Sequence, residues 1–479
     1  MNLADLNQFV EKKWDNDLVP RLVDYVRVPA KSPAFDGSWD AHGYLHAVVK
    51  AAEGWCRSQS IKGLTIEIVA TEGKTPCLLF DVPATHGLGN DRTVLFYGHL
   101  DKQPEMVGWR EDLGPWKPVY EDGKLYGRGS ADDGYAIYAA LTTIAALDAQ
   151  GVARPRCVGI IETCEESGSP DLPEYLTLLA PRFGDVQLVV GLDSGCRNYD
   201  QLWVTTSLRG LVGGTLTVEI LSEGVHSGHA SGIVPSSFRI ARQLLNRLDD
   251  SATGKVLLAE LHADIPPERV RQAHTAGEIL GDEVWKEFPW VSCSHGSGGH
   301  LHAMPVSTDP VEGILNRTWR PALAVTGAAG FPSIDSAGNV LRPKTTFKLS
   351  MRIPPTVDGK MATSAMRKVL TENPPYNAKV SFDADCGATG WNAPETASWL
   401  KSALAQASEQ SYGREVAWIG EGGTIPFMNM LGERFPRAQF FITGVLGPHS
   451  NAHGPNEFLH VPYAKKLTAA VASVVAAVR

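Results

Sequence analysis

The chain has 479 residues and a formal net charge of −9, with 44 basic and 53 acidic side chains. One hydrophobic core seldom supports so long a chain, so we expect two domains or one elaborated domain. The charge is spread along the chain without a basic block, which argues against nucleic acid or an anionic membrane as a partner. Small soluble substrates suit this composition better.

The cysteines and the first segment both indicate a reducing compartment. Seven cysteines are scattered without a CxxC pair, and their odd total does not suit a disulfide framework. The first 26 residues have acids among their apolar positions, which predicts an amphipathic helix and not a secretion signal. No stretch approaches the ~20 uninterrupted apolar residues of a membrane span. We therefore expect a cytoplasmic protein.

The first two hundred residues predict alternating helices and strands. Helices are expected at residues 3–28, 41–59, 131–149 and 172–179, and strands at 64–70, 76–82, 93–97, 157–163 and 186–192. The strands are apolar on both faces, which is typical of an α/β fold with a helix-flanked, mostly parallel sheet. Ligands of such sheets lie beyond the carboxyl ends of the strands. The polar residues at such ends are His99, Glu165, Glu166 and Asp193.

After Ser207 the order of elements changes. We expect a strand at 213–221, a helix at 235–248, strands at 322–326 and 345–353, a helix at 356–370 and a strand at 378–384. This βαββαβ order is the split ferredoxin-like arrangement, so it indicates an inserted second domain, elaborated at residues 251–320. The remaining elements are a helix at 396–411, strands at 415–419 and 439–443, and a helix at 462–478. The prediction is a discontinuous catalytic domain at residues 1–207 and 387–479, interrupted by a ferredoxin-like lid or dimerisation domain at residues 208–386.

Four short motifs carry the chemistry-bearing residues: GHLDKQP at 98–104, GRGSADDG at 127–134, ETCEESGS at 162–169 and AHGPNE at 452–457. Taken singly, a His or Asp at a strand end is more often a turn residue than a ligand. Together, two imidazoles and several carboxylates on separate loops are the ligand set of a two-metal hydrolytic site. Two metals about 3.5–4 Å apart need a shared ligand, and a carboxylate can bridge through its two oxygens where a neutral imidazole cannot. Asp132, in a Gly-flanked turn before a helix, is the candidate bridge.

These motifs, with HSG at 226–228, resemble those of a family of co-catalytic zinc metallopeptidases. The family includes carnosinase-like cytosolic dipeptidases, succinyl-diaminopimelate desuccinylase and aminoacylase, and GHLDKQP is most similar to the dipeptidase branch. The resemblance implies two divalent metal ions, with zinc expected first and manganese or cobalt as alternatives. The metal ligands that it implies are His99, Asp132, Glu166, Asp193 and His453. By the same analogy His99 and Asp193 hold one ion, Glu166 and His453 hold the other, and Asp132 is shared.

The resemblance also implies the groups that act on the water. Glu165 matches the general base of the family. Adjacent residues on an extended segment point in different directions, so Glu165 can face the attacking water while Glu166 faces a metal. Asp101 would orient His99 or modulate the base. The family pattern has its late His four residues before Glu457, which selects His453 over His449 as the last ligand.

The substrate contacts follow from the same resemblance. His226 of the HSG motif would stabilise the oxyanion, in cis or from a partner subunit, and Arg352 would hold the carboxylate of the substrate. The EGGTIPF segment matches a substrate-contacting loop, with Gly423, Thr424 and Ile425 as the contacts. Two departures from the family pattern stand out. Gly134 and Tyr135 follow the paired aspartates where the family usually has Lys-Gly, and GHASG follows the HSG histidine.

The activity implied is hydrolysis of an amide bond in dipeptides or small peptides by a bridging hydroxide, with Glu165 as general base, in a homodimer joined through the inserted domain. An N-acyl amino acid deacylase or desuccinylase with the same two-metal site is the alternative, and no residue of the sequence separates the two. A non-catalytic scaffold relative would be expected to have lost the base or a ligand, and all six positions are present.

Overall fold

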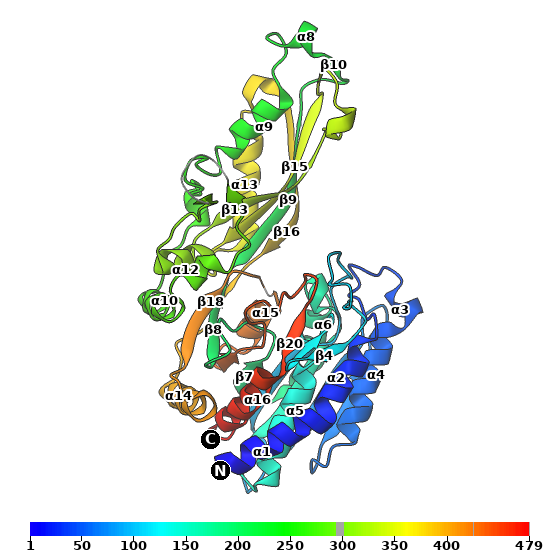
Figure 1. Cartoon of the computed structure of the whole chain (residues 1–479), viewed down its shortest axis with the longest axis vertical. Helices are drawn as coiled ribbons and strands as arrows, with labels where there is room; N and C mark the ends of the chain where they lie inside the picture. Colours follow the sequence, from blue (N-terminus) through cyan, green and yellow to red (C-terminus); the bar gives the residue numbers. More distant parts are fainter. Residues whose placement is uncertain (294–300, 425, 479) are drawn as a thin grey trace. The chain divides into compact units, whose positions relative to one another are not determined.

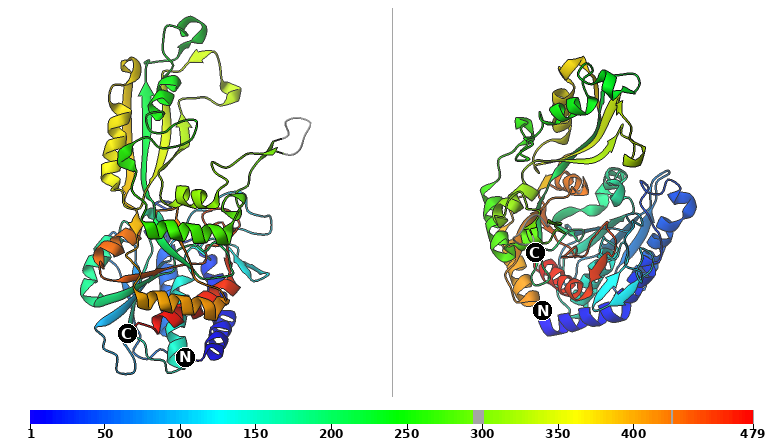
Figure 2. Two further views of the ribbon diagram at one scale, coloured as in Figure 1. Left: turned by 90° about the vertical axis from the view of Figure 1, so that its left-hand side faces the viewer. Right: turned by 45° about the horizontal axis from the view of Figure 1, so that its top comes forward.

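The computed structural model describes residues 1–293, 301–424 and 426–478. They form two compact units, drawn in Figure 1 and from two further directions in Figure 2. Unit 1 comprises Met1–Thr205, Ala393–Trp418 and Met430–Arg479, and unit 2 comprises Thr206–Asn392 and Ile419–Asn429. Within the described residues, no helix has both the length and the apolar character to cross a membrane. The role of the inserted segment as a lid or dimerisation domain stays a prediction.

A six-stranded sheet forms the centre of unit 1. Its strands, in spatial order, are β1 (Thr65–Val69), β2 (Cys77–Val82), β6 (Arg156–Glu162), β3 (Arg92–His99), β7 (Asp185–Gly191) and β19 (Gln439–Ile442). Strand β3 pairs in parallel with both β6 and β7, and β7 pairs in parallel with β19, while β1 and β2 are antiparallel. The predicted mostly parallel sheet is therefore confirmed, and the carboxyl ends of β6, β3 and β7 lie next to one another.

The helices of unit 1 come from both ends of the chain. The predicted helix at 3–28 is observed as α1 (Leu3–Lys13), a π-helical turn (Trp14–Leu18) and α2 (Val19–Val26). The other helices are α3 (Trp39–His42), α4 (Tyr44–Arg57), α5 (Ala136–Ala149), α6 (Leu172–Leu178), α7 (Ala180–Phe183), α14 (Ser398–Tyr412) and α16 (Val461–Val475). In Figure 1, α1 (blue) lies beside α16 (red). The buried indole of Trp14 donates to Thr468 Oγ1 at 3.0 Å, which ties the first helical segment to the last helix.

The expected helix at 131–149 begins later than predicted, at Ala136. Residues 131–135 form a turn instead, and the backbone N–H of Ala131 donates to the Glu457 carboxylate at 3.3 Å. The alanines around this segment favour a helix, but tertiary contacts with the late AHGPNE loop hold it as a turn. Asp132 therefore lies in a loop that faces the end of the sheet.

Unit 2 is built on a four-stranded antiparallel sheet. Its order is β13 (Ala322–Ala329), β15 (Lys344–Ile353), β9 (Gly210–Glu219) and β16 (Lys379–Ala388). Helices α9 (Ser237–Leu245) and α13 (Gly359–Thr371) share one hydrophobic core with the inward residues of these strands, such as Leu216, Leu349 and Phe382. The observed order of elements is the predicted βαββαβ.

Shorter elements complete the chain. The small strands are β4 (Val119–Glu121), β5 (Lys124–Tyr126), β8 (Trp203–Leu208), β10 (Val225–His226), β11 (Ser292–Cys293), β12 (Leu301–His302), β14 (Val340–Leu341), β17 (Trp391–Asn392), β18 (Ala417–Glu421) and β20 (Phe458–His460). The further helices are α8 (Ser227–Ala230), α10 (Pro267–Leu280), α11 (Glu283–Lys286), α12 (Pro310–Thr318) and α15 (Pro426–Arg434). Helices α10, α11 and α12 fall in the predicted elaboration at residues 251–320.

Candidate metal centre

Four of the predicted site residues lie where neighbouring parallel strands of unit 1 end. His99 is the last residue of β3, and Asp193 follows the end of β7. Glu165 and Glu166 lie in a 3₁₀ turn, Glu165–Ser167, that follows β6. Because β3 is hydrogen-bonded to both other strands, these side chains converge at one edge of the sheet.

Asp132 lies between two imidazoles. Its Oδ1 is 3.3 Å from Nε2 of His99, and its Oδ2 is 3.0 Å from Nε2 of His453. The carboxylate itself is buried, whereas the His453 side chain is 57% exposed. Each oxygen of one carboxylate therefore faces a different imidazole, which is the arrangement that a ligand shared between two cations requires.

The remaining carboxylates surround the same two imidazoles. Nε2 of His99 is 3.8 Å from Asp193 Oδ2 and 4.0 Å from Glu165 Oε2. Nε2 of His453 is 3.3 Å from Glu166 Oε2. Two sets of potential ligand atoms lie within 4.8 Å of one another, namely His99, Asp132 and Glu166, and His99, Glu165 and Asp193. The structure thus brings together all six residues predicted as ligands or base, while their individual roles stay predictions.

Two atoms of the cluster lack hydrogen-bond partners. Among the described residues, Nε2 of His99 and Oε1 of Glu166 are buried without an acceptor or donor of good geometry. Buried polar atoms are usually paired, because an unpaired one loses the free energy of hydration without compensation. An imidazole nitrogen and a carboxylate oxygen are both common metal ligands, and a divalent cation would supply each of these atoms with a partner. The donor set therefore fits a metal centre.

Burial and mutual repulsion raise the pKa values of the carboxylates. Burial, with the charge of Asp132 adding to it, raises the pKa of Asp193 to about 7. Burial and Asp193 raise the pKa of Glu165 well above its ordinary value, and burial and Asp132 raise that of Glu166. The electrostatics of this pocket thus favour positive charge, whether a proton or a metal ion.

The pKa values of the His453 imidazole and of the shared Asp132 carboxylate shift in the direction that favours the charged form of each group. Burial lowers the pKa of His453, but hydrogen bonds with Asp132 and Glu166 outweigh it and raise the pKa to about 11. Burial raises the pKa of Asp132, but the two imidazoles that face its oxygens, those of His453 and His99, outweigh it and keep this pKa below its ordinary value. Asp132 is therefore the carboxylate most readily kept ionised in the cluster.

Asp101 supports two parts of the site at once. Its backbone carbonyl lies 3.1 Å from Nδ1 of His99, and its carboxylate Oδ1 lies 3.4 Å from the same nitrogen. The two carboxylate oxygens also accept hydrogen bonds from the backbone N–H groups of Glu165, at 3.1 Å, and Glu166, at 3.0 Å. The fully buried Asp101 side chain therefore fixes the segment of the predicted base as well as the orientation of the imidazole.

Sequence reasoning missed a buried ion pair that joins two ligand loops. The Arg128 guanidinium donates to Glu457 Oε2 at 2.7 Å and to the backbone carbonyls of His453 and Gly454 at 3.1 and 2.8 Å. The other oxygen of Glu457 accepts from the Gly129 N–H at 3.0 Å. Arg128 and Glu457 lie inside the motifs that carry Asp132 and His453. This nearness in sequence was the available indication that the two charges support the ligand loops.

A second missed residue is Gln103, the Gln of GHLDKQP. Its side-chain amide donates to Glu166 Oε2 at 2.5 Å. This contact orients the carboxylate that faces His453, because an amide N–H fixes one of the two oxygens. Gln103 lies within the GHLDKQP motif, but a Gln beside a Pro has no sequence pattern that indicates contact with a metal ligand.

The other predicted residues belong to unit 2. Nη1 of Arg352 donates to Thr424 Oγ1 at 2.8 Å, and the Thr424 hydroxyl donates to the Arg209 carbonyl at 2.7 Å. Gly423 is exposed, with open space where a Cβ would stand. His226 is exposed, and its Nδ1 accepts from the Gly228 N–H at 3.2 Å. Ile425 lies outside the described residues, and the predicted contacts of these residues with substrate stay predictions.

Known dipeptidases are similar to this chain. It is 29% identical over 387 residues to the Cys-Gly metallodipeptidase DUG1 of Saccharomyces cerevisiae, with 76% of each chain covered. It is 28% identical over 368 residues to the Beta-Ala-His dipeptidase of Homo sapiens, with 72% of this chain and 68% of the relative covered. The solved structure of the dipeptidase Dug1p from Saccharomyces cerevisiae shares the fold, with a TM-score of 0.75 and 22% identity over 99% of this chain and 98% of that chain.

The match to a family model covers most of the chain. Residues 95–477 match the model of Peptidase family M20/M25/M40. The matched region contains Asp132 and the five residues around it, so the family and the buried ligand cluster point to the same chemistry. The chain therefore belongs to Peptidase family M20/M25/M40, and it is a hydrolytic enzyme of the metallopeptidase class.

Proposed function

We propose that the protein is a two-metal dipeptidase that hydrolyses the amide bond of dipeptides or small peptides. The observation that carries the proposal is the position of Asp132, whose two oxygens face His99 and His453 at 3.3 and 3.0 Å. Two relatives that are similar over most of this chain are named for Cys-Gly and Beta-Ala-His dipeptides. These names support a dipeptide as the substrate class here.

The residues suggest a division between two ions. His99, Asp193 and Asp132 would hold the first ion, and Glu166, His453 and Asp132 would hold the second. Imidazole and carboxylate ligands fit zinc, while manganese and cobalt suit the same donors. Bound ions would supply Lewis-acid polarisation of the scissile carbonyl and a lowered pKa of the attacking water.

Glu165 is the general base of the proposed reaction. Its carboxylate is largely buried beside Asp193, and burial together with that neighbour raises its pKa well above the ordinary value. A raised pKa suits a group that must take a proton and give it back near neutral pH. Glu165 takes the proton from the attacking water and returns it to the leaving amine. Asp101 holds the Glu165 backbone in place for both steps.

Arg352 and His226 complete the proposal from unit 2. Among the described residues Arg352 has no carboxylate partner, so its guanidinium is available to the C-terminal carboxylate of a substrate. Thr424 fixes this guanidinium from one side. The His226 imidazole would stabilise the oxyanion of the tetrahedral intermediate.

A homodimer suits the exposed edge of the unit 2 sheet. Strand β13 lies at the edge, and its sequence ALAVTGAA has no charged side chain to oppose pairing with another strand. Val325 on this strand is 48% exposed, and Phe331 and Ile334 just beyond it are also exposed. We propose that a second copy of the chain covers this edge and supplies His226 to the first.

A cytoplasmic location is part of the same proposal. The six cysteines whose side chains are described are all free, and five of them are buried. Free buried thiols suit a reducing compartment, where they behave as small apolar side chains.

The first prediction concerns the base. Glu165→Gln should lower kcat by about 10²–10⁴-fold, because it removes proton transfer and keeps the shape of the site. Zinc-loaded protein would be given a panel of dipeptides, longer peptides and N-acetyl and N-succinyl amino acids, with released amines identified by mass spectrometry. Glu72→Gln, at an exposed acid, is the matched control. Turnover of blocked amino acids alone would instead establish the deacylase, and no turnover with two metals bound would refute the enzyme proposed here.

The second prediction concerns the carboxylate anchor. Arg352→Ala should lower kcat/KM for dipeptides by roughly 10- to 100-fold, as expected for the loss of about 1.5–3 kcal/mol from a charged hydrogen bond. The C-terminal amides of the same dipeptides should lose nothing, because they lack the carboxylate. Arg239→Ala, at an exposed arginine of α9, is the control. Equal losses on acids and amides would show that Arg352 acts on structure and not on the carboxylate.

The third prediction concerns metal removal and pH. The pKa of Asp193 is raised from 3.8 to about 7 in the folded chain, so the folded metal-free protein binds a proton that the unfolded chain releases. The contribution of Asp193 to the free energy of unfolding of the metal-free protein therefore falls as pH rises between these two values. Proton competition for the ligands also weakens with rising pH, which strengthens metal binding.

Chelation with EDTA should consequently lower Tm more at pH 8 than at pH 5.5. Differential scanning calorimetry with and without EDTA at the two pH values measures both gaps. A gap that is equal or smaller at pH 8 would contradict the prediction.

The fourth prediction concerns the partner subunit. Mixing inactive His226→Ala and Glu165→Gln proteins under subunit exchange should restore activity, because each mixed dimer contains one site with an intact base and an intact histidine from its partner. Subunit exchange is followed by native mass spectrometry of differently tagged chains. Mixed dimers that form and remain inactive would place His226 in its own subunit's site.

A further inference from the structure

Two buried tyrosines donate hydrogen bonds to the backbone beside two proposed ligands of the same ion. The Tyr25 hydroxyl donates to the carbonyl of Leu100, the residue after His99, at 3.0 Å. The Tyr135 hydroxyl donates to the carbonyl of Leu192, the residue before Asp193, at 2.5 Å. The Tyr135 hydroxyl therefore fixes the peptide group that joins Leu192 to Asp193, and the Tyr25 hydroxyl fixes the Leu100–Asp101 peptide, one residue beyond His99.

Tyr25 is itself held firmly at the end of helix α2. The Nζ of Lys102, which is fully buried, donates to the carbonyls of Tyr25 and Val28 at 2.7 and 2.8 Å. The end of α2 and the segment His99–Lys102 are thus joined by hydrogen bonds in both directions. A hydroxyl anchored in this way can restrain the Leu100–Asp101 peptide, and with it the segment that follows His99, because the tyrosine has little freedom to move.

The two tyrosines depend on the positions at which this sequence departs from the family pattern. A Cβ added to Gly134 would stand 2.1 Å from Cε1 of Tyr25, so the ring can occupy its place only beside a glycine. Tyr135 is the next residue, and its side chain is completely buried. The Gly134-Tyr135 pair therefore makes room for one tyrosine and supplies the other.

We propose that Tyr25 and Tyr135 are positioning residues for the first ion, holding His99 and Asp193 at the separation that the ion requires. The inference rests on the proposed two-metal site. The second ion has separate supports: Arg128 holds the His453 backbone, and Gln103 holds the Glu166 carboxylate. Loss of either tyrosine hydroxyl weakens the binding of the first ion more than that of the second.

The test uses variants that remove one hydroxyl and keep the ring. Tyr25→Phe and Tyr135→Phe would each be placed in two backgrounds, His453→Ala, which retains the first ion, and Asp193→Ala, which retains the second. Zinc affinity of the metal-free proteins is measured by isothermal titration calorimetry, without any substrate. The matched control is Tyr138→Phe on helix α5.

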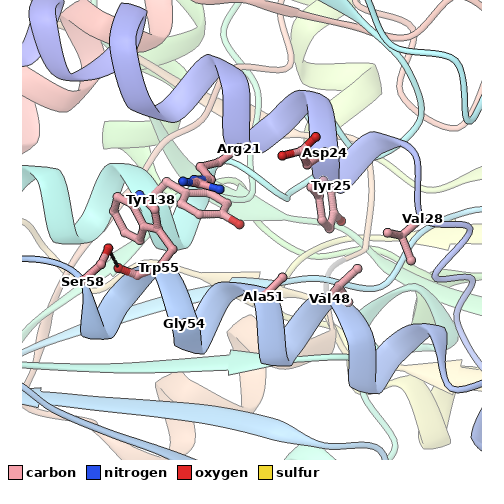
Figure 3. Close-up of a pocket in the computed structure, with 10 residues that line it drawn as sticks. All are labelled: Arg21, Asp24, Tyr25, Val28, Val48, Ala51, Gly54, Trp55, Ser58 and Tyr138. Atoms are coloured by element: carbon pink, nitrogen blue, oxygen red, sulfur yellow. Dashed lines mark hydrogen bonds between the residues drawn. The ribbon is translucent and has the colours of Figure 1, made fainter.

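Tyr138 suits this purpose because it lines the same cavity as Tyr25. It is buried, and within the described part of the chain its hydroxyl has no hydrogen-bond partner. Both side chains line a cavity of about 480 Å³ between helices α2 and α4, together with Trp55 (Figure 3). Tyr138→Phe therefore tests the general effect of removing a buried hydroxyl from this region.

In the His453→Ala background, Tyr25→Phe and Tyr135→Phe should each weaken zinc binding by about tenfold or more, the usual effect of removing an outer-shell support. In the Asp193→Ala background each change should lower the affinity clearly less, and Tyr138→Phe should leave both backgrounds unchanged. Equal weakening in both backgrounds, or none in either, would overturn the proposal. If circular dichroism shows that only one of the two tyrosine variants is folded, that variant is sufficient to test the proposal.

The outcome is independent of turnover. Selective loss of the first ion in a protein that cleaves no dipeptide would support the tyrosines and refute the substrate proposal. Normal dipeptide turnover with unaltered zinc affinities would support the substrate proposal and refute the positioning role of the tyrosines.

Discussion

The structure depends on the burial of several carboxylates around two imidazoles. Ionised carboxylates are costly to remove from water unless positive charge compensates them, and here burial raises the pKa values of Asp193, Glu165 and Glu166 together. The pKa of Asp132 is lowered instead, because an imidazole faces each of its oxygens. The loops around the sheet edge are arranged to hold these charges close to one another, and the chemistry of a metallopeptidase follows from that arrangement.

The sheet and most of the ligand cluster were predictable because one topological rule covers them. Buried parallel strands place their carboxyl ends together, so the pattern of strands alone leads one to expect that His99, Glu166 and Asp193 meet. His453 belongs to a distant loop, and only its motif connected it to the others. The turn at residues 131–135 was predicted as helix because the alanines that follow it favour helix, while the contact that holds it as a turn comes from Glu457.

The supporting contacts could not be predicted, and the reason is physical. Tyr25, Tyr135 and Lys102 act by donating to backbone carbonyls, and such contacts leave no periodicity or spacing in the sequence. The buried pair of Arg128 and Glu457 is similar. Removing two charges from water costs several kcal/mol per ion, so such a pair is a poor source of stability in itself. Its hydrogen bonds to the His453 loop and to the Gly129 turn explain why these charges lie where they do.

The proposed ligands are drawn from both ends of a discontinuous unit, and this has a consequence during synthesis. His99, Asp132 and Asp193 leave the ribosome before unit 2 is made, but His453 follows it, and helix α16 must still pack against α1. A nascent chain therefore lacks the His453 side of the proposed site until unit 2 has been translated. The proposed site is thus assembled only after the inserted unit has been made.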